Sequence, residues 1–230
     1  MAMTDKQIDT SQDLEKLYSN RFDGDQTLKK RDVMWKCICK YFLQKYIPKD
    51  AKILDIASGY CEFINNIEGS EKYAIDLNPD ITNFADKSIK VIHEDILDDK
   101  TNLPINYFDI VFISNFLEHL DSKEDVKRVI NKSKQYLNEN GKIIILQPNI
   151  RYVKGRYWDF FDHKTPLTEK SLIECANILN LKVVKCYKRT LPYTQKSKIP
   201  MHSFLIICYC KLMPISSIFL GAQSLIILKK

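Results

Sequence analysis

A run of small residues follows an apolar segment in Ile53-Leu-Asp-Ile-Ala-Ser-Gly-Tyr60. Small side chains at Ala57, Ser58 and Gly59 let the backbone approach a ligand closely, and glycine adopts backbone angles that other residues resist. The first strand-to-helix turn of an open parallel sheet is a docking place for nucleotide-type ligands. The run is therefore interpreted as such a binding turn, with a tight structural connection as the alternative.

Further polar groups follow at the spacing that a nucleoside ligand needs. Asp76 comes about 20 residues after Asp55, where a carboxylate can accept hydrogen bonds from both hydroxyls of a ribose. Asp95 follows the next apolar run, where a carboxylate can meet the exocyclic amine of an adenine. Ser114 and Asn115 end the run after that. Each group is expected at the carboxyl end of a strand, and these ends meet at one edge of a parallel sheet.

Two histidines are candidates for proton transfer. His119 lies just past the fourth apolar run, and His163 lies in an Asp-His pair after the fifth. A positioned histidine is the usual general base for removing a hydroxyl proton. The alternatives are that the Glu118-His119 pair caps a helix and lines a pocket, and that His163 stabilises a turn. The two remaining histidines are expected to be structural: His93 and His202.

Residues 149–158 mix basic and aromatic side chains. If this segment is a loop over the site, Arg151 and Arg156 can bind phosphate oxygens in a bidentate manner. Tyr157 is added as a third candidate for contact with the substrate. The alternative is a solvated loop with aromatic anchors.

Short apolar runs alternate with longer amphipathic segments, which is typical of a parallel sheet covered by helices on both faces. A helix is expected over residues 123–137, followed by a turn at 138–141. Thr168 is expected to cap another helix that ends near residue 179. The expected strands are residues 52–56, 72–76, 90–93, 108–114, 142–147, 181–187 and 224–228.

The two ends of the chain differ from this alternating middle. Residues 13–46 are expected to be largely helical, so residues 1–48 are interpreted as a helical cover and 49–230 as the main domain. An apolar insert at about 190–221 is expected before the last strand. Its apolar runs are shorter than the ~20 residues that span a bilayer. It is interpreted as a packed helical insert or as a surface that contacts a membrane.

Composition limits the class of protein. With 230 residues, 45% hydrophobic and 28% charged, the chain has the content of one globular domain. A net charge of +6 permits an anionic substrate without requiring nucleic acid. The seven cysteines form no Cys-x-x-Cys pair, and no cluster of acids follows the fourth strand, so no metal is expected. Residues 1–13 lack a signal-peptide core, which favours a reducing cytoplasm.

Taken together, these motifs resemble the class I S-adenosylmethionine-dependent methyltransferases over residues 30–190. The resemblance rests on Leu54–Tyr60, Asp76, Glu94-Asp95, Phe108–Val111 and Leu117-Glu118-His119 in order. It implies an α/β, Rossmann-like sheet of six parallel strands and an antiparallel last strand, with helices on both faces. It also implies S-adenosylmethionine as the cofactor and methyl transfer as the activity.

The same resemblance assigns roles to individual residues. Ala57, Ser58 and Gly59 are expected at the methionine part of the cofactor, Asp76 at the ribose and Ser114 at the sulfonium. Tyr18, Arg21 and Phe22 are expected to fold over the cofactor carboxylate. The complete set of expected cofactor-binding residues is Asp55, Ala57, Ser58, Gly59, Phe63, Asp76, Leu77, Asp95, Ile96, Ser114 and Asn115.

Residues 60–66 and 157–168 resemble one branch of that family, encoded among bacterial surface-polysaccharide genes. This implies methylation of a sugar or of a group attached to it, and the basic residues of 149–158 suggest a small, anionic or phosphorylated acceptor. The oxygen that is methylated is then a sugar hydroxyl or a phosphate-type oxygen. The family's usual first glycine is replaced by Ala57 and a later one by Cys61. The alternatives are methylation of RNA or another small molecule, and a catalytically silent ligand-binding protein. A nicotinamide-dependent reductase would keep a three-glycine turn, which is absent here.

Overall fold

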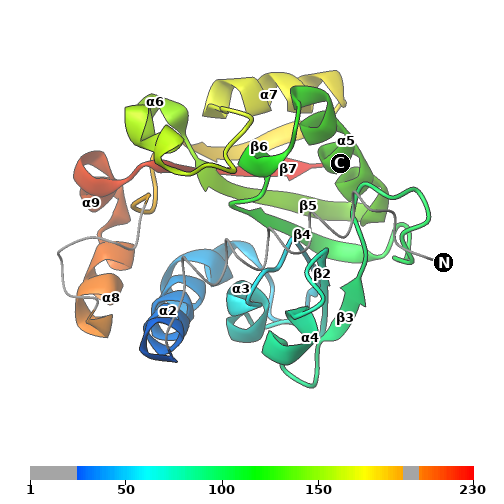
Figure 1. The fold of residues 1–230 in the computed structure, drawn as a ribbon, viewed down its shortest axis with the longest axis horizontal. Helices are drawn as coiled ribbons and strands as arrows, with labels where there is room; N and C mark the ends of the chain where they lie inside the picture. Colours follow the sequence, from blue (N-terminus) through cyan, green and yellow to red (C-terminus); the bar gives the residue numbers. More distant parts are fainter. Residues whose placement is uncertain (1–24, 194–201) are drawn as a thin grey trace.

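Seven strands form one sheet in the order β3-β2-β1-β4-β5-β7-β6 (Figure 1). The computed structural model of the chain describes residues 25–193 and 202–230. Only β7 runs antiparallel to its neighbours, β5 and β6. This arrangement confirms the fold expected from sequence. The strands are β1 (Lys52–Ile56), β2 (Glu71–Asp76), β3 (Lys90–His93), β4 (Phe108–Ser114), β5 (Leu137–Pro148), β6 (Lys182–Tyr187) and β7 (Gln223–Lys229).

Each face of the sheet carries its own apolar core, because successive side chains of a strand point to opposite faces. Along β1, Ile53 faces one core and Leu54 the other. The first core is covered by α2 (Asp25–Ile38), α3 (Glu62–Asn66), α4 (Ile81–Phe84), α8 (Ser203–Lys211) and α9 (Met213–Leu220). The second is covered by α5 (Lys123–Tyr136) and α7 (Glu169–Ile178), which lie together in Figure 1.

A smaller apolar cluster anchors the segment between β5 and α7. This segment contains α6 (Ile150–Val153) and the 3₁₀ helix η4 (Lys154–Asp159). Val153 and Tyr157 pack against Ala222, which lies immediately before β7. The segment is therefore held over the carboxyl end of β5, at the edge of the sheet where the candidate site lies.

The prediction of a turn at residues 138–141 is wrong. Helix α5 ends at Tyr136, and β5 begins at once at Leu137, so these residues form the start of a long strand. A register shift opposite Phe108 and Ile110 accommodates the extra residues. Gly141 is needed there because a Cβ atom would lie 2.9 Å from the carbonyl oxygen of Phe108. The glycine marks a close approach of two strands rather than a turn.

The N-terminal helical segment is confirmed where the structure describes it. Helix α2 continues as a π-helical turn at Cys39–Leu43 and a 3₁₀ turn at Gln44–Tyr46. Residues 13–24, with Tyr18, Arg21 and Phe22, lie outside the described residues. The seven cysteines form no disulfide with one another.

The described part of the expected insert consists of α8 and α9. Cys210 and Met213 pack into the first core, whereas Phe204 and Phe219 are 71% and 76% exposed. In the two described ranges, no single helix has the length and apolar character to cross a membrane. Helices α8 and α9 satisfy that test only as a pair, bent by 107°. The division into a cover and a main domain stays a prediction.

Candidate active site

The loop after β1 keeps the backbone shape of a glycine turn although it contains one glycine. Ala57, Gly59 and Cys61 have φ angles of 55°, 52° and 57°, all in the left-handed region. Non-glycine residues pay roughly 1–2 kcal/mol for this conformation. The Ser58 hydroxyl donates to the carbonyl oxygen of Asp55 at 2.8 Å and holds the turn closed. The chain therefore forms this turn at an energetic cost.

Asp76 ties this loop to the end of β2. The N–H of Gly59 donates to its Oδ2 at 2.7 Å, and the N–H of Asn78 donates to its Oδ1 at 2.8 Å. Burial raises the pKa of Asp76, although these backbone donors oppose the shift. Each carboxylate oxygen can accept a further hydrogen bond. The side chain is thus fixed and can still accept from a ligand hydroxyl.

Other expected cofactor-binding residues take more structural roles. Asp55 is 2% exposed, and burial raises its pKa. Phe63 is buried and stacks on Phe112 with ring centroids 3.6 Å apart. Asp95 is exposed, and its Oδ1 accepts the N–H of Leu97 at 2.8 Å. Two residues follow strands at the same edge: Leu77, 39% exposed, and Ile96, buried.

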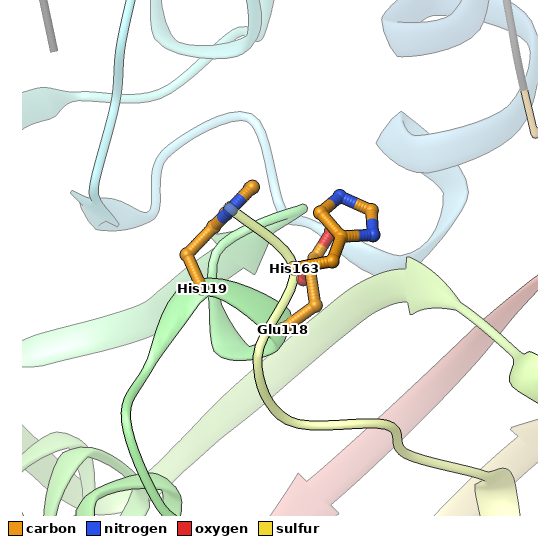
Figure 2. Close-up of side chains that lie close together, drawn as sticks. All are labelled: Glu118, His119 and His163. Carbon is orange, nitrogen blue, oxygen red and sulfur yellow. The ribbon is translucent and has the colours of Figure 1, made fainter. Parts of the chain in front are cut away.

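The end of β4 turns sharply toward a polar cluster. Asn115 has a φ of 48°, and its side-chain amide donates to the Ser114 hydroxyl at 2.9 Å. The 3₁₀ helix η3 (Leu117–His119) follows at once. Glu118 and His119 of η3 lie beside His163, and one ligand-type atom from each side chain lies within 4.8 Å of the others (Figure 2).

Asp162 positions His119. The imidazole Nδ1 lies 3.1 Å from the Asp162 carboxylate and 3.2 Å from its carbonyl oxygen. Burial opposes protonation, but the bond to Asp162 and the charges of Glu118 and Asp162 raise the pKa of His119 above its usual value. Because Asp162 engages Nδ1, the other ring nitrogen, Nε2, is left for a different partner.

Aromatic packing fixes His163. Its ring stacks on Phe160 at 4.9 Å and lies 4.6 Å from the ring of Tyr157. The two histidine rings meet edge to face, with centroids 4.9 Å apart. The sequence predictions for His119 and His163 thus converge on one place in the fold.

A family model described as a methyltransferase domain matches residues 54–145. The match runs from β1 into β5 and includes the loop after β1, Asp76 and η3. The match over residues 54–145 indicates an S-adenosylmethionine-dependent methyltransferase, and the strand order is that of the class I methyltransferase fold. No curated protein matches the chain in sequence.

Solved structures show the same fold at low sequence identity. A methyltransferase from Archaeoglobus fulgidus has a TM-score of 0.63 and 23% identity, covering 94% of this chain and 99% of its own. One from Thermotoga maritima has a TM-score of 0.63 and 14% identity, covering 94% and 98%. A Haloferax volcanii protein, solved in complex with the methyltransferase activator Trm112, has a TM-score of 0.60 and 8% identity, covering 100% and 99%.

The strand ends of this methyltransferase fit its cofactor. S-adenosylmethionine needs a close backbone approach, an acceptor for the ribose hydroxyls and an apolar surface for the adenine. The left-handed loop and the fixed carboxylate of Asp76 meet the first two needs at one edge of the sheet, and Ile96 at the same edge packs into the second core. When bound, the cofactor supplies an electrophilic methyl group. The individual contacts stay predictions.

The residues expected to bind the acceptor are spread over α6 and η4. Tyr157 is fully buried, and its hydroxyl donates to the carbonyl oxygen of Thr165 at 2.7 Å. Arg151 lies 3.8 Å from Glu169 with its side chain half exposed, and Arg156 is exposed. In this conformation the two arginines can reach a ligand, whereas Tyr157 supports the loop.

A cavity of about 410 Å³ lies away from these groups. It is lined by residues of α2, α3 and α4 together with Tyr60, and none of the expected cofactor-binding residues lines it. We take the strand ends, with their converging polar groups, as the site of chemistry.

Two functional candidates escaped the sequence reasoning: Glu118, which was noted only as part of a motif, and Asp162, which was noted only as a neighbour of His163. The signal was the presence of two acid-histidine pairs, 118–119 and 162–163. Nothing local in the sequence shows that the acid of one pair contacts the histidine of the other.

Proposed function

We propose that this methyltransferase acts on a hydroxyl oxygen of a small, anionic acceptor that is sugar-linked or phosphorylated. We place it in the bacterial cytoplasm, in surface-polysaccharide biosynthesis. The supporting observation is the cluster of Glu118, His119 and His163 directly after the end of β4 (Figure 2). It puts proton-accepting groups beside the expected position of the sulfonium methyl.

Oxygen acceptors need such a cluster. As the hydroxyl oxygen bonds to the methyl carbon, the carbon–sulfur bond breaks with its electron pair on sulfur, and the hydroxyl proton has to leave. A group with a pKa near the working pH accelerates that proton transfer by typically 10²–10⁴-fold. The proton passes to the cluster and then to solvent.

The loop around η4 favours a sugar-linked, anionic acceptor. Trp158 and Phe161 are 58% and 95% exposed, and they flank the segment that leads to His163. Exposed aromatic rings offer apolar surfaces for a sugar ring, while Arg151 and Arg156 offer donors for phosphate oxygens. The combination suits a sugar nucleotide or a phosphorylated sugar.

Transfer of labelled methyl groups over a panel of acceptors tests this proposal. The panel holds sugar nucleotides, phosphorylated sugars, the matching unphosphorylated sugars, and RNA. We expect label in the phosphorylated sugar compounds, with Arg151→Ala and Arg156→Ala raising the KM for them at least about 10-fold, since each removes a charge-assisted hydrogen bond. Transfer to RNA alone, or to no member of the panel, would refute it.

A second proposal concerns the exposed apolar surface of α8 and α9. We propose that this surface lies on an anionic membrane. Lys40 and Lys211 lie beside it, with their ammonium groups 5.5 and 5.7 Å from the ring centroid of Tyr41. Basic groups next to apolar side chains favour anionic lipid surfaces. The exposed apolar residues are Phe204, Leu205, Leu212, Ile215, Ile218, Phe219 and Leu220.

A further inference from the structure

Glu118, His119 and His163 carry the types of atom that bind transition metals. One atom from each lies within 4.8 Å of the other two. Ligands at about 2.0–2.2 Å from a tetrahedral ion lie about 3.3 Å apart, so these atoms need to close by at most about 1.5 Å. Figure 2 shows the carboxylate of Glu118 close to the imidazole of His163, with His119 on the other side of the loop that carries His163.

Glu118 supplies an independent sign of a missing partner. The residue is 2% exposed, and its Oε2 has no hydrogen-bond partner among the described residues. A buried carboxylate oxygen without a partner is costly, and buried charges are normally paired or bound to a metal. A cation at the cluster would supply the partner that Oε2 lacks.

The surroundings of the histidines favour ligation through Nε2. Histidine ligands usually donate their other ring N–H to a carboxylate, a carbonyl or water. Nδ1 of His119 lies 3.1 Å from the Asp162 carboxylate, which is this arrangement. Nδ1 of His163 lies 3.5 Å from the hydroxyl of Tyr193. The Nε2 atom of His119 is thereby left for an ion, and the contact with Tyr193 orients the ring of His163.

The backbone holds the two parts of the cluster together. The carbonyl oxygen of Glu118 accepts the N–H groups of Lys164 at 2.9 Å and Thr165 at 3.0 Å. The hydroxyl of Thr165 donates to the carbonyl oxygen of Leu120 at 2.6 Å. These bonds fix His163 against η3 independently of any ion, so the ligand set is largely preformed.

We propose that Glu118, His119 and His163 bind one divalent transition-metal ion. Two imidazoles and one carboxylate form a ligand set used by zinc and non-haem iron sites that keep open positions. The inference rests on the proposed function, because an open position would bind the acceptor hydroxyl and lower its pKa, releasing the proton to solvent. The histidines are then ligands rather than bases. The sequence expectation of no metal considered the cysteine pattern and acidic clusters after the fourth strand, and not two acid-histidine pairs from different parts of the chain.

Titration of chelator-treated protein with Co²⁺ tests this site. We expect one ion per chain, with visible absorption of a low-coordinate nitrogen and oxygen site. Loss of a residue that only hydrogen-bonds to a metal ligand lowers metal affinity about 10–100-fold. Loss of a ligand itself should lower it more, so Glu118→Gln, His119→Ala and His163→Ala should each weaken binding at least about 100-fold. Asp162→Asn keeps all three ligands and should weaken binding about 10–100-fold. The control is His202→Ala, an exposed histidine outside the cluster.

The results distinguish a failure of the proposed metal site from a failure of the proposed methyl transfer to oxygen. Absence of Co²⁺ binding, binding with thiolate absorption, or binding that the four cluster variants leave unchanged would overturn the metal site. Asp162→Asn keeps the test decisive if a ligand variant does not fold. Methyl transfer to oxygen by metal-free protein would refute the catalytic role of the metal and leave the proposed function standing. Metal binding without transfer to any oxygen acceptor would refute the function alone.

Discussion

The Nδ1 atom of His119 lies 3.1 Å from the carboxylate of Asp162, which comes from a different part of the chain. The contact links the segment after β4 to the segment after β5. It orients the imidazole and, since Asp162 precedes His163, it also places the second histidine. The chemistry proposed above depends on this link together with the backbone bonds from Lys164 and Thr165 to Glu118.

Removing the negative charge of Asp162 tests that link. Asp162→Asn should lower kcat about 10–100-fold, because the imidazole of His119 loses the partner that orients it. The KM for S-adenosylmethionine and the free energy of unfolding should change little, since a positioning role acts on the chemistry. Steady-state kinetics and denaturant unfolding measure both quantities.

Asp159→Asn is the matched control for this variant, because Asp159 is an exposed aspartate in the same segment. Its kcat should equal that of the wild type. A loss of kcat in the control as large as in Asp162→Asn would show that the segment responds to any lost charge.

Asp76 should carry much of the affinity for the cofactor. In Asp76→Asn, one carboxylate oxygen becomes an NH₂ donor that faces a backbone N–H, because both oxygens of Asp76 accept one, and the charge that a ribose hydroxyl would meet is lost. Hydrogen bonds to charged groups contribute about 1.5–3 kcal/mol, so the Kd for S-adenosylmethionine should rise at least about 10-fold. Calorimetry measures it, with the exposed Asp86→Asn as control. An unchanged Kd would show that Asp76 does not contribute to cofactor binding.

The loop after β1 should be stabilised by restoring a glycine. Ala57 has a φ of 55°, which costs roughly 1–2 kcal/mol, and the added freedom of a glycine in the unfolded chain costs about 0.4–1 kcal/mol. Ala57→Gly should therefore raise the free energy of unfolding by up to about 1.5 kcal/mol. Urea unfolding measures the change. The reverse change at a similar φ, Gly59→Ala, should lower the free energy of unfolding. A lower free energy of unfolding in Ala57→Gly would contradict the proposed backbone strain at Ala57.

Lipid binding should depend on the exposed surface of α8 and α9. Phe219→Asp places a charge on an apolar side chain that is 76% exposed, so it should greatly weaken co-sedimentation with anionic vesicles. Ile178→Asp makes the same type of change on α7, at a side chain 64% exposed, and should have no effect. Equal vesicle binding by both variants and the wild type would contradict the proposed contact of α8 and α9 with the membrane.

Local sequence patterns were enough to predict most of the elements. The apolar run Lys52–Ile56 is β1 without any shift, and Thr168 caps α7 through a capping box with Ser171. These features depend on neighbouring residues only. The start of β5 was missed because Leu137 continues directly from a helix, and its pairing with β4 is a long-range contact.

The site was predicted less completely than the fold. The loop after β1 and Asp76 follow from position along strands, whereas the pairing of Glu118 with Lys164 and Thr165 is a long-range backbone contact. Tyr157 shows the same limit. An aromatic residue in a basic loop suggested contact with substrate, but tertiary packing buries it and assigns its hydroxyl to Thr165.

The position of the transferred methyl group is the most direct test of the proposed chemistry. The wild-type protein, S-adenosylmethionine with a ¹³C-labelled methyl group, and the acceptor that takes up most label are combined, and the product is analysed by carbon NMR. We predict a methoxyl signal coupled to a carbon of the sugar, weakened in Asp76→Asn and lost in His119→Ala. A signal from a methyl group on nitrogen or carbon, or a methoxyl signal of equal size in His119→Ala, would contradict it.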